Sequence, residues 1–242
     1  MVSDIIRVNP NRIYQHIKSF IRPQSVPLSI CKTFTGFSFG DQGWHHLIEL
    51  LKEKENHPDL IYKSSILYCF HQLYRPEGTF ELVKDRNNEE VKFKPALGIF
   101  PWGSFRIGYG LNWVLETKNW KNSRFCGPTS DDFMKLYDQI KNNGYKPYQY
   151  GFIGGTTLKR HNGDERFVVL QGNHRSAILS FLGFDSMSVK PVTGRYNIIK
   201  EKDVANWHYV KNNQCSKKDV LAYFNAFFEL NSTDLANRFG LV

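Results

Sequence analysis

The clearest pattern of apolar and polar positions lies between residues 167 and 192. Its first residues, Phe167–Leu170, are all apolar and predict a buried strand. A helix is then predicted by apolar residues that recur at helical spacing, namely Ala177, Ile178, Phe181 and Leu182. Gly183 stands where a left-handed C-terminal cap belongs, and residues 186–192 predict a second strand. The pattern therefore predicts a strand, a tight turn, a short helix and another strand in succession.

Shorter stretches with the spacing typical of helices or of strands occur along the rest of the chain. Apolar residues at helical spacing predict helices over residues 9–22, 41–51, 58–75, 130–144 and 216–228, with a last helical turn from Thr233. Strands are predicted over residues 79–84, 91–94, 96–100 and 148–159, whereas residues 23–40 are rich in turn-forming residues. Three glycines between residues 151 and 155 interrupt the last strand, which indicates either a bulge or the close approach of a ligand.

This order of elements predicts an α+β protein. Residues 1–78 form a helical extension, residues 79–193 a core of short mixed sheet and helices, and residues 194–242 a C-terminal helical segment packed on the core. No stretch rich in glycine and serine separates these parts, so we expect them to pack as one body. The length of 242 residues suffices for one large domain or for one domain with a substantial extension.

The turn at Gly172 carries the candidate chemistry. Glycine allows a tight turn and the close approach of another group. The backbone N–H groups that follow belong to the first helical turn, so they have no intrahelical partners and point outward with the positive end of the helix dipole. Such a terminus binds anions, phosphate above all. Arg175 adds a bidentate donor and His174 a group that titrates near neutrality, and we expect Arg175 to point toward a ligand rather than into the core.

The run FVVLQGNHRSAILSFLGFDSMSVKPV, residues 167–192, resembles the core of the ParB/sulfiredoxin-like superfamily. In that superfamily a strand delivers a G-x-x-R turn onto a helix N-terminus, and the turn binds nucleotide phosphates. Gly172, His174 and Arg175 match the GCHR turn of sulfiredoxins, and Gly172 and Arg175 match the GERR turn of ParB. The resemblance extends over residues 92–193. Asn173 stands where sulfiredoxins carry their catalytic cysteine, which argues against sulfinic-acid repair.

The resemblance implies that the turn binds ATP or another nucleotide, with Mg²⁺ bridging its phosphates. The implied contacts are Gly172, Asn173, His174, Arg175, Ser176 and Arg106. The last of these lies in the loop that follows the first strand of the core, a loop that reaches toward the ligand in the superfamily.

Free-serine kinases of the superfamily imply a phosphotransferase that acts on a small-molecule substrate. These kinases use a glutamate in the loop after the first strand, whereas residues 99–107 contain no Glu or Asp. The residues left as candidates for the catalytic base are His174, Glu165, Glu116 and Asp164.

The charge of the chain leaves a second class of function open. The net charge is +9, and residues 92–160 contain 11 Lys and Arg against 4 Asp and Glu. Such a basic segment attracts phosphorylated ligands or nucleic acid, so the alternative is a nucleic-acid-binding or nucleotide-gated module without catalysis. No basic helix-turn-helix follows the core as it does in ParB, which counts against chromosome segregation. A third alternative is an interaction protein without a ligand, in which Arg175 forms a surface salt bridge and His174 a hydrogen bond to the turn.

The four cysteines, Cys31, Cys69, Cys126 and Cys215, are far apart and form no C-x-x-C pair. The sequence therefore predicts neither a metal site nor a redox dithiol, and free thiols in a reducing cytosol are the simplest interpretation. No signal peptide opens the chain, and no apolar stretch approaches the roughly 18 residues of a membrane-spanning helix. We therefore expect a cytoplasmic protein without a membrane partner.

Overall fold

A computed structural model describes residues 23–33, 36–39, 45–73, 100–103, 130–191, 198–230 and 232–241. The helix predicted over residues 9–22 and the hairpin strands predicted over 79–84 and 91–94 lie outside the described residues. The strand predicted over residues 96–100 also lies outside them, except for its last residue.

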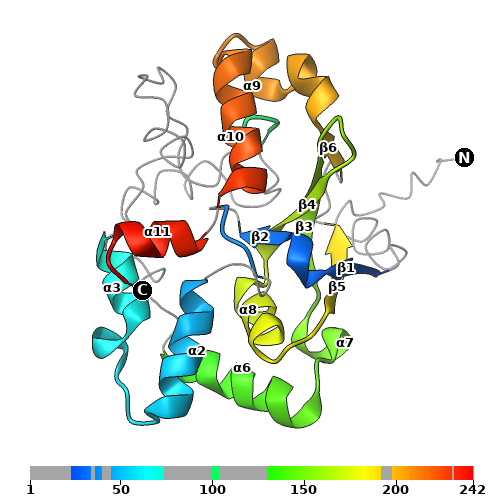
Figure 1. Ribbon diagram of the computed structural model, residues 1–242. Helices are drawn as coiled ribbons and strands as arrows, with labels where there is room; N and C mark the ends of the chain where they lie inside the picture. Colours follow the sequence, from blue (N-terminus) through cyan, green and yellow to red (C-terminus); the bar gives the residue numbers. More distant parts are fainter. Residues whose placement is uncertain are drawn as a thin grey trace, which may run out of the picture.

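The described strands form one mixed sheet. They are β1 (Gln24–Pro27), β2 (Cys31–Thr33), β3 (Ile153–Lys159), β4 (Glu165–Gln171), β5 (Ser186–Pro191) and β6 (Ile198–Lys200). Their order is β1-β5-β3-β4-β2, and β6 pairs with β3 (Figure 1). β3 pairs antiparallel with β4 on one edge and parallel with β5 and then β6 on the other. The prediction of an α+β protein with a mixed sheet is therefore confirmed.

The first two strands come from a segment that the sequence predicted to be a turn-rich part of a helical extension. β1 pairs antiparallel with β5, and β2 pairs in parallel with β4. That part of the prediction is wrong, because residues 24–27 and 31–33 belong to the sheet. β1 has four residues and β2 three, too few for an alternating pattern to stand out, and pairing with β5 and β4 decides their conformation. The division of the chain at residues 78 and 193 stays a prediction.

The glycines in β3 have a packing cause. The pairing register shifts between Gly154 and Gly155, which is the bulge that the sequence left as one of two alternatives. A Cβ atom at Gly155 would overlap the carbonyl oxygen of Val168 and lie 2.6 Å from the ring of Phe167. The neighbouring strand β4 therefore leaves no room for a side chain at Gly155.

Helices lie near the predicted positions that the structure describes. The helices are α2 (His46–Asn56), α3 (Ile66–Leu73), α6 (Ser130–Asn143), α7 (Pro147–Tyr150), α8 (Asn173–Phe181), α9 (His208–Lys211), α10 (Lys217–Glu229) and α11 (Ser232–Arg238), with 3₁₀ turns η1 (Leu28–Ile30), η2 (Tyr62–Ser64) and η4 (Glu201–Asn206). However, α2 runs on past residue 51 to Asn56, and the segment predicted as one helix from residue 58 has a 3₁₀ turn before α3 begins at Ile66. The strand predicted from residue 148 is wrong at its start, because Pro147 opens the short helix α7, where its fixed φ suits the first turn. Within the described part of the chain, no helix is long and apolar enough to cross a membrane.

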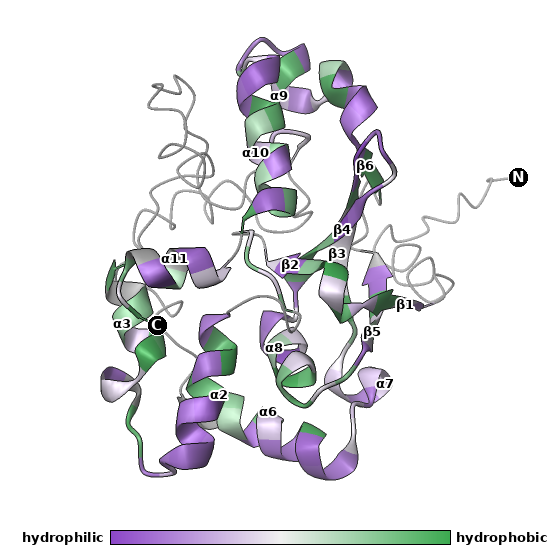
Figure 2. Ribbon diagram, in the orientation of Figure 1, coloured by the Kyte–Doolittle hydropathy of each residue, from purple (hydrophilic) through white to green (hydrophobic). Residues whose placement is uncertain are grey.

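The sheet has an apolar core on each face. One core joins α2, α6 and α8 to Phe167 and Val169 of β4, and the other joins α10 to Val168. Figure 1 shows α2, α6 and α8 below the sheet, with α9 and α10 above it. Figure 2 shows α2 and α10 banded with hydrophobic and hydrophilic residues, as expected of helices with one buried side. The uninterrupted apolar run of β4 thus reflects a strand that is covered on both faces.

A lysine lies inside the structure at the end of α10. Lys32 of β2 is 7% exposed, and its Nζ donates a hydrogen bond to the carbonyl oxygen of Leu230 at 3.0 Å. Leu230 is the residue that ends α10, where a positive charge interacts favourably with the helix dipole. Burial, and to a smaller extent the charge of Arg166, lower the pKa of Lys32 to about 8.

We predict that the buried charge of Lys32 makes stability depend on pH above pH 8. The folded protein releases this proton near pH 8 and the unfolded chain near pH 10.5, so between these values the unfolded chain binds more protons and stability rises with pH. Relative to Lys32→Met, the free energy of unfolding of the wild type should rise by up to about 3 kcal/mol across this window and stay level below it. Urea melts of both proteins at a series of pH values measure the difference, and a difference that does not change with pH would contradict the prediction.

Candidate phosphate-binding site

The turn at Gly172 joins β4 to α8 and leaves the start of the helix without a side-chain cap. Gly172 is the N-cap residue and has φ +94°, a left-handed conformation that suits glycine. No side chain caps the first turn of α8. The backbone N–H groups at the start of the helix therefore have no capping side chain, and their binding of an anion stays a prediction.

Ser176 shapes the turn from the inside. The residue is fully buried, and both its backbone N–H and its hydroxyl donate to the carbonyl oxygen of Gly172, at 3.0 and 3.1 Å. Its hydroxyl also lies 3.5 Å from the sulfur of Met187. Ser176 thus supports the turn, and the structure does not bring its side chain to the ligand side, where the sequence had predicted a contact.

Arg175 is directed at the backbone of the preceding loop. Its Nη1 donates to the carbonyl oxygen of Tyr150, and its Nη2 donates to that of Phe152 at 3.3 Å. These carbonyls lie on either side of Gly151, at the end of α7 and in the short loop that leads into β3. Two donors of the guanidinium thus hold this loop against the start of α8, a structural role that the sequence did not predict, and the expectation that Arg175 points toward a ligand rather than into the core stays a prediction.

Two glycines make room for the guanidinium. Gly151 has φ +85° and Gly172 has φ +94°. A Cβ atom at Gly151 would lie 2.6 Å from Nη1 of Arg175, and one at Gly172 would lie 2.9 Å from Nη2. Both glycines are thus required by backbone conformation and by the close approach of the same side chain. We refer to Arg175 with its two carbonyl partners as the Arg175 clamp.

The loop held by the Arg175 clamp has all its central carbonyls paired. The hydroxyl of Tyr145 donates to the carbonyl oxygen of Gly151 at 2.9 Å, between the two carbonyls that Arg175 binds. Sequence reasoning missed this role of Tyr145. The available signal was an aromatic residue between the predicted helix 130–144 and the predicted strand 148–159, close in sequence to Gly151.

The positive charge of Arg175 has no carboxylate partner among the described residues. The ion pairs of the described chain involve other side chains, and the partners of Arg175 are neutral carbonyls. The side chain is only partly buried. A charge that is fixed beside an uncapped helix N-terminus strengthens the attraction of that terminus for an anion.

His174 and Asn173 complete the start of α8. The ring of His174 packs against the ring of Phe133, with centroids 5.2 Å apart. Burial, and to a smaller extent the charge of Arg175, lower the pKa of His174, so the imidazole is neutral at neutral pH and can accept a proton. The side-chain oxygen of Asn173 is buried without a hydrogen-bond partner among the described residues.

Of the carboxylates proposed as catalytic bases, Glu165 and Asp164 are described, and neither lies at the turn. Glu165 begins β4 and forms an ion pair with Lys159 at 2.7 Å. The turn follows the other end of the strand, about 20 Å away at the rise of an extended chain. Glu165 is therefore too distant to act on a ligand bound at α8. Glu116 and Arg106 lie outside the described residues.

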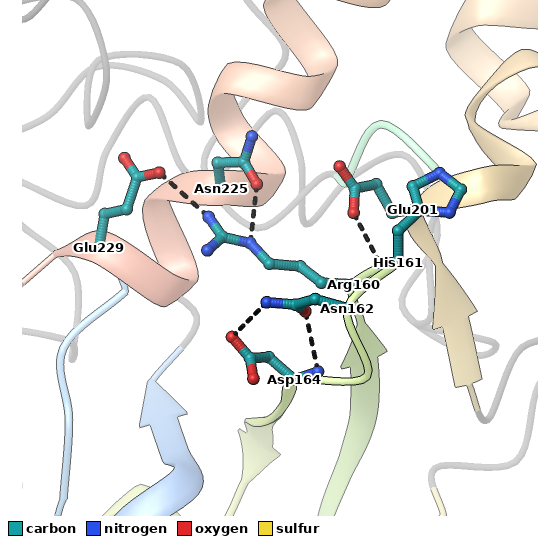
Figure 3. Close-up of polar contacts among 7 residues, drawn as sticks. All are labelled: Arg160, His161, Asn162, Asp164, Glu201, Asn225 and Glu229. Atoms are coloured by element: carbon teal, nitrogen blue, oxygen red, sulfur yellow. Dashed lines mark hydrogen bonds and ion pairs between the residues drawn. The ribbon is translucent and has the colours of Figure 1, made fainter.

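Asp164 lies at the tip of the β3–β4 hairpin, where the polar side chains serve the fold. Its carboxylate accepts from Asn162, and its backbone N–H donates to the side chain of Asn162 (Figure 3). Arg160 attaches the hairpin to α10 through Asn225 and Glu229, each at 3.0 Å. Asp164 therefore belongs to a structural network at the end of the sheet remote from the turn.

Comparison of the chain with protein-family models, with curated proteins and with solved structures finds no match. Across the described residues, no three His, Cys, Asp or Glu side chains come together as metal ligands. The site is thus defined by its own geometry: an uncapped helix N-terminus, a fixed guanidinium and a neutral histidine.

We predict that Arg175→Ala destabilises the protein in the absence of any ligand. The substitution removes charge-assisted hydrogen bonds to two carbonyls, so the free energy of unfolding should fall by about 1.5–3 kcal/mol. Arg175→Lys keeps the charge but loses the planar fork, and should recover only part of that loss. Chemical denaturation measures all three proteins. An Arg175→Ala protein as stable as the wild type would show that the clamp contributes nothing to the fold.

Proposed function

We propose that the N-terminus of α8 binds the phosphates of ATP or another nucleotide, and that the protein is a phosphotransferase acting on a small molecule. The observation that carries the proposal is a helix N-terminus without a side-chain cap beside a guanidinium that pairs with no carboxylate among the described residues. Backbone N–H groups and a positive charge at one place favour a phosphate over other small anions.

The order of elements supports the same proposal. The helix α6, the β3–β4 hairpin, the Gly172 turn, α8 and β5 follow one another in the order that the resemblance to the ParB/sulfiredoxin-like superfamily implies. Gly172, His174 and Arg175 all lie in this turn or in the first turn of the helix. Because Asn173 replaces the sulfiredoxin cysteine, the kinases of that superfamily are the closer functional model.

The residues of the turn have distinct parts in the proposed reaction. The backbone N–H groups at the start of α8 bind phosphate oxygens. The positive charge of Arg175 offsets the negative charge of the phosphates. Fixed donors of this kind stabilise the charge that develops on the transferred group. The neutral imidazole of His174 accepts the proton of the acceptor hydroxyl, which requires a base that is unprotonated at neutral pH.

The nucleotide itself would supply most of the ligands for Mg²⁺. The described residues offer no cluster of carboxylates for a metal ion, and Mg²⁺ commonly binds through substrate phosphates and water. Arg106 stays a predicted phosphate contact and Glu116 a predicted base, both outside the described residues.

A charge reversal at the first residue of α8 tests phosphate binding. Asn173→Asp places a negative charge where the phosphate would bind, so the affinity for ATP and ADP should fall about ten- to a hundredfold. An acid in the first helical turn is favourable to the helix, whereas burial of its side-chain oxygen is not, so a circular-dichroism melt of the variant is the control for folding. Asn206→Asp makes the same charge change at an exposed residue of η4 and should bind like the wild type.

Calorimetric titration with and without Mg²⁺ compares these proteins. If ATP does not bind to the wild type, or if both variants bind it as the wild type does, the phosphate site is not at α8.

A substitution of His174 tests the proposed chemistry apart from binding. His174→Asn keeps a polar side chain but removes the base, so ADP formation from ATP, with water as a surrogate acceptor, should fall about a hundred- to ten-thousandfold. The affinity for ATP should change little. The wild type should stay active down to below pH 6.5, because burial lowers the pKa of His174. Equal turnover in the variant and the wild type would exclude His174 as the base.

A further inference from the structure

A second surface is formed by side chains from α7, from the loop that follows it and from β5. Tyr148 is 83% exposed, and its ring meets the ring of Phe152 edge to face, with centroids 5.0 Å apart. The Nζ atom of Lys190 lies 4.1 Å from the centroid of the Phe152 ring and 6.0 Å from that of Tyr148. The residues come together because β5 runs alongside β3, so that Lys190 pairs in register with Gly154. We refer to Tyr148, Phe152 and Lys190 as the aromatic platform.

The backbone beneath the aromatic platform is fixed. The carbonyls of Tyr150, Gly151 and Phe152 all accept hydrogen bonds from side chains, two from Arg175 and one from Tyr145. An exposed ring on a fixed backbone loses little conformational freedom when a flat ligand stacks on it. The platform is therefore suited to binding and not only to packing.

The charge near the rings is positive. Lys190 contacts the two rings and pairs with no carboxylate among the described residues. Arg175 adds a second cation beneath the same loop, and the chain as a whole carries a net charge of +9. A ligand for this surface therefore combines a flat ring with negative charge.

We propose that the aromatic platform binds single-stranded nucleic acid, with a base stacked on Tyr148 and a backbone phosphate beside Lys190. Exposed aromatic rings next to lysine and arginine are how proteins bind single strands without regard to sequence. A duplex hides the faces of its bases, so stacking on Tyr148 requires an unpaired base. This activity is separate from the proposed phosphotransfer, because it uses neither the N-terminus of α8 nor His174.

Binding of a fluorescein-labelled oligo-dT, followed by fluorescence anisotropy at low salt, tests the role of the ring. Tyr148→Ala should weaken binding about five- to a hundredfold, and Tyr148→Phe should keep most of it, since stacking needs the ring and not the hydroxyl. The matched control is Phe184→Ala, which removes a ring that is 41% exposed beyond the C-terminal end of α8. This control should bind like the wild type.

The salt dependence of binding tests the role of the charge. Lys190→Gln should reduce the slope of log affinity against log salt by about 0.7, the value for one phosphate contact on a single strand. Lys202→Gln, at an exposed lysine of η4, should leave the slope unchanged. The proposal is overturned if the wild type does not bind oligo-dT at low salt, if a duplex binds as tightly, or if Tyr148→Ala binds like the wild type.

Discussion

Two hydrogen bonds from Arg175 to the carbonyls of Tyr150 and Phe152 connect the start of α8 to the loop before β3. The position of the guanidinium explains why residues 151 and 172 are glycines, since a Cβ atom at either position would collide with it. The two hydrogen bonds also connect the two surfaces that we propose to bind ligands, because Arg175 lies in the first turn of α8 and its carbonyl partners belong to Tyr150 and Phe152, next to and within the aromatic platform. Arginine is a side chain typical of phosphate recognition. Arg175 here orders the backbone and also places its positive charge beside the N-terminus of α8.

The central part of the fold could be predicted because its sequence pattern is long. Seven residues of β4 and nine of α8 give enough positions to separate the period of a strand from that of a helix, and Gly172 marks the turn between them. β1 and β2 could not be predicted, because strands of four and three residues carry almost no pattern and are defined by their pairing with β5 and β4. The start of β3 was misassigned because Pro147 favours a helical turn over the expected strand.

The position of the candidate site could be predicted more fully than the directions of its side chains. The partners of Arg175 are backbone carbonyls, which every sequence supplies and no pattern reveals. The role of Ser176 had a signal in hindsight, since a serine hydroxyl in a helix often bonds to the carbonyl four residues earlier, as it does to Gly172. The distance of Glu165 from the turn also followed from the strand itself, because an extended chain separates its two ends by the full length of β4.

Titration of the ¹⁵N-labelled protein with ADP, followed by the backbone amide resonances, tests most directly whether the α8 terminus beside the Arg175 clamp binds phosphate. Hydrogen bonds from backbone N–H groups to a phosphate change the environment of those amides more than that of any others. We therefore expect the largest shifts at Asn173 and His174, with smaller shifts in the loop around Gly151 that Arg175 holds. Binding of ADP that leaves the amides of Asn173 and His174 unmoved, or no shift at any amide, would contradict this interpretation of the site.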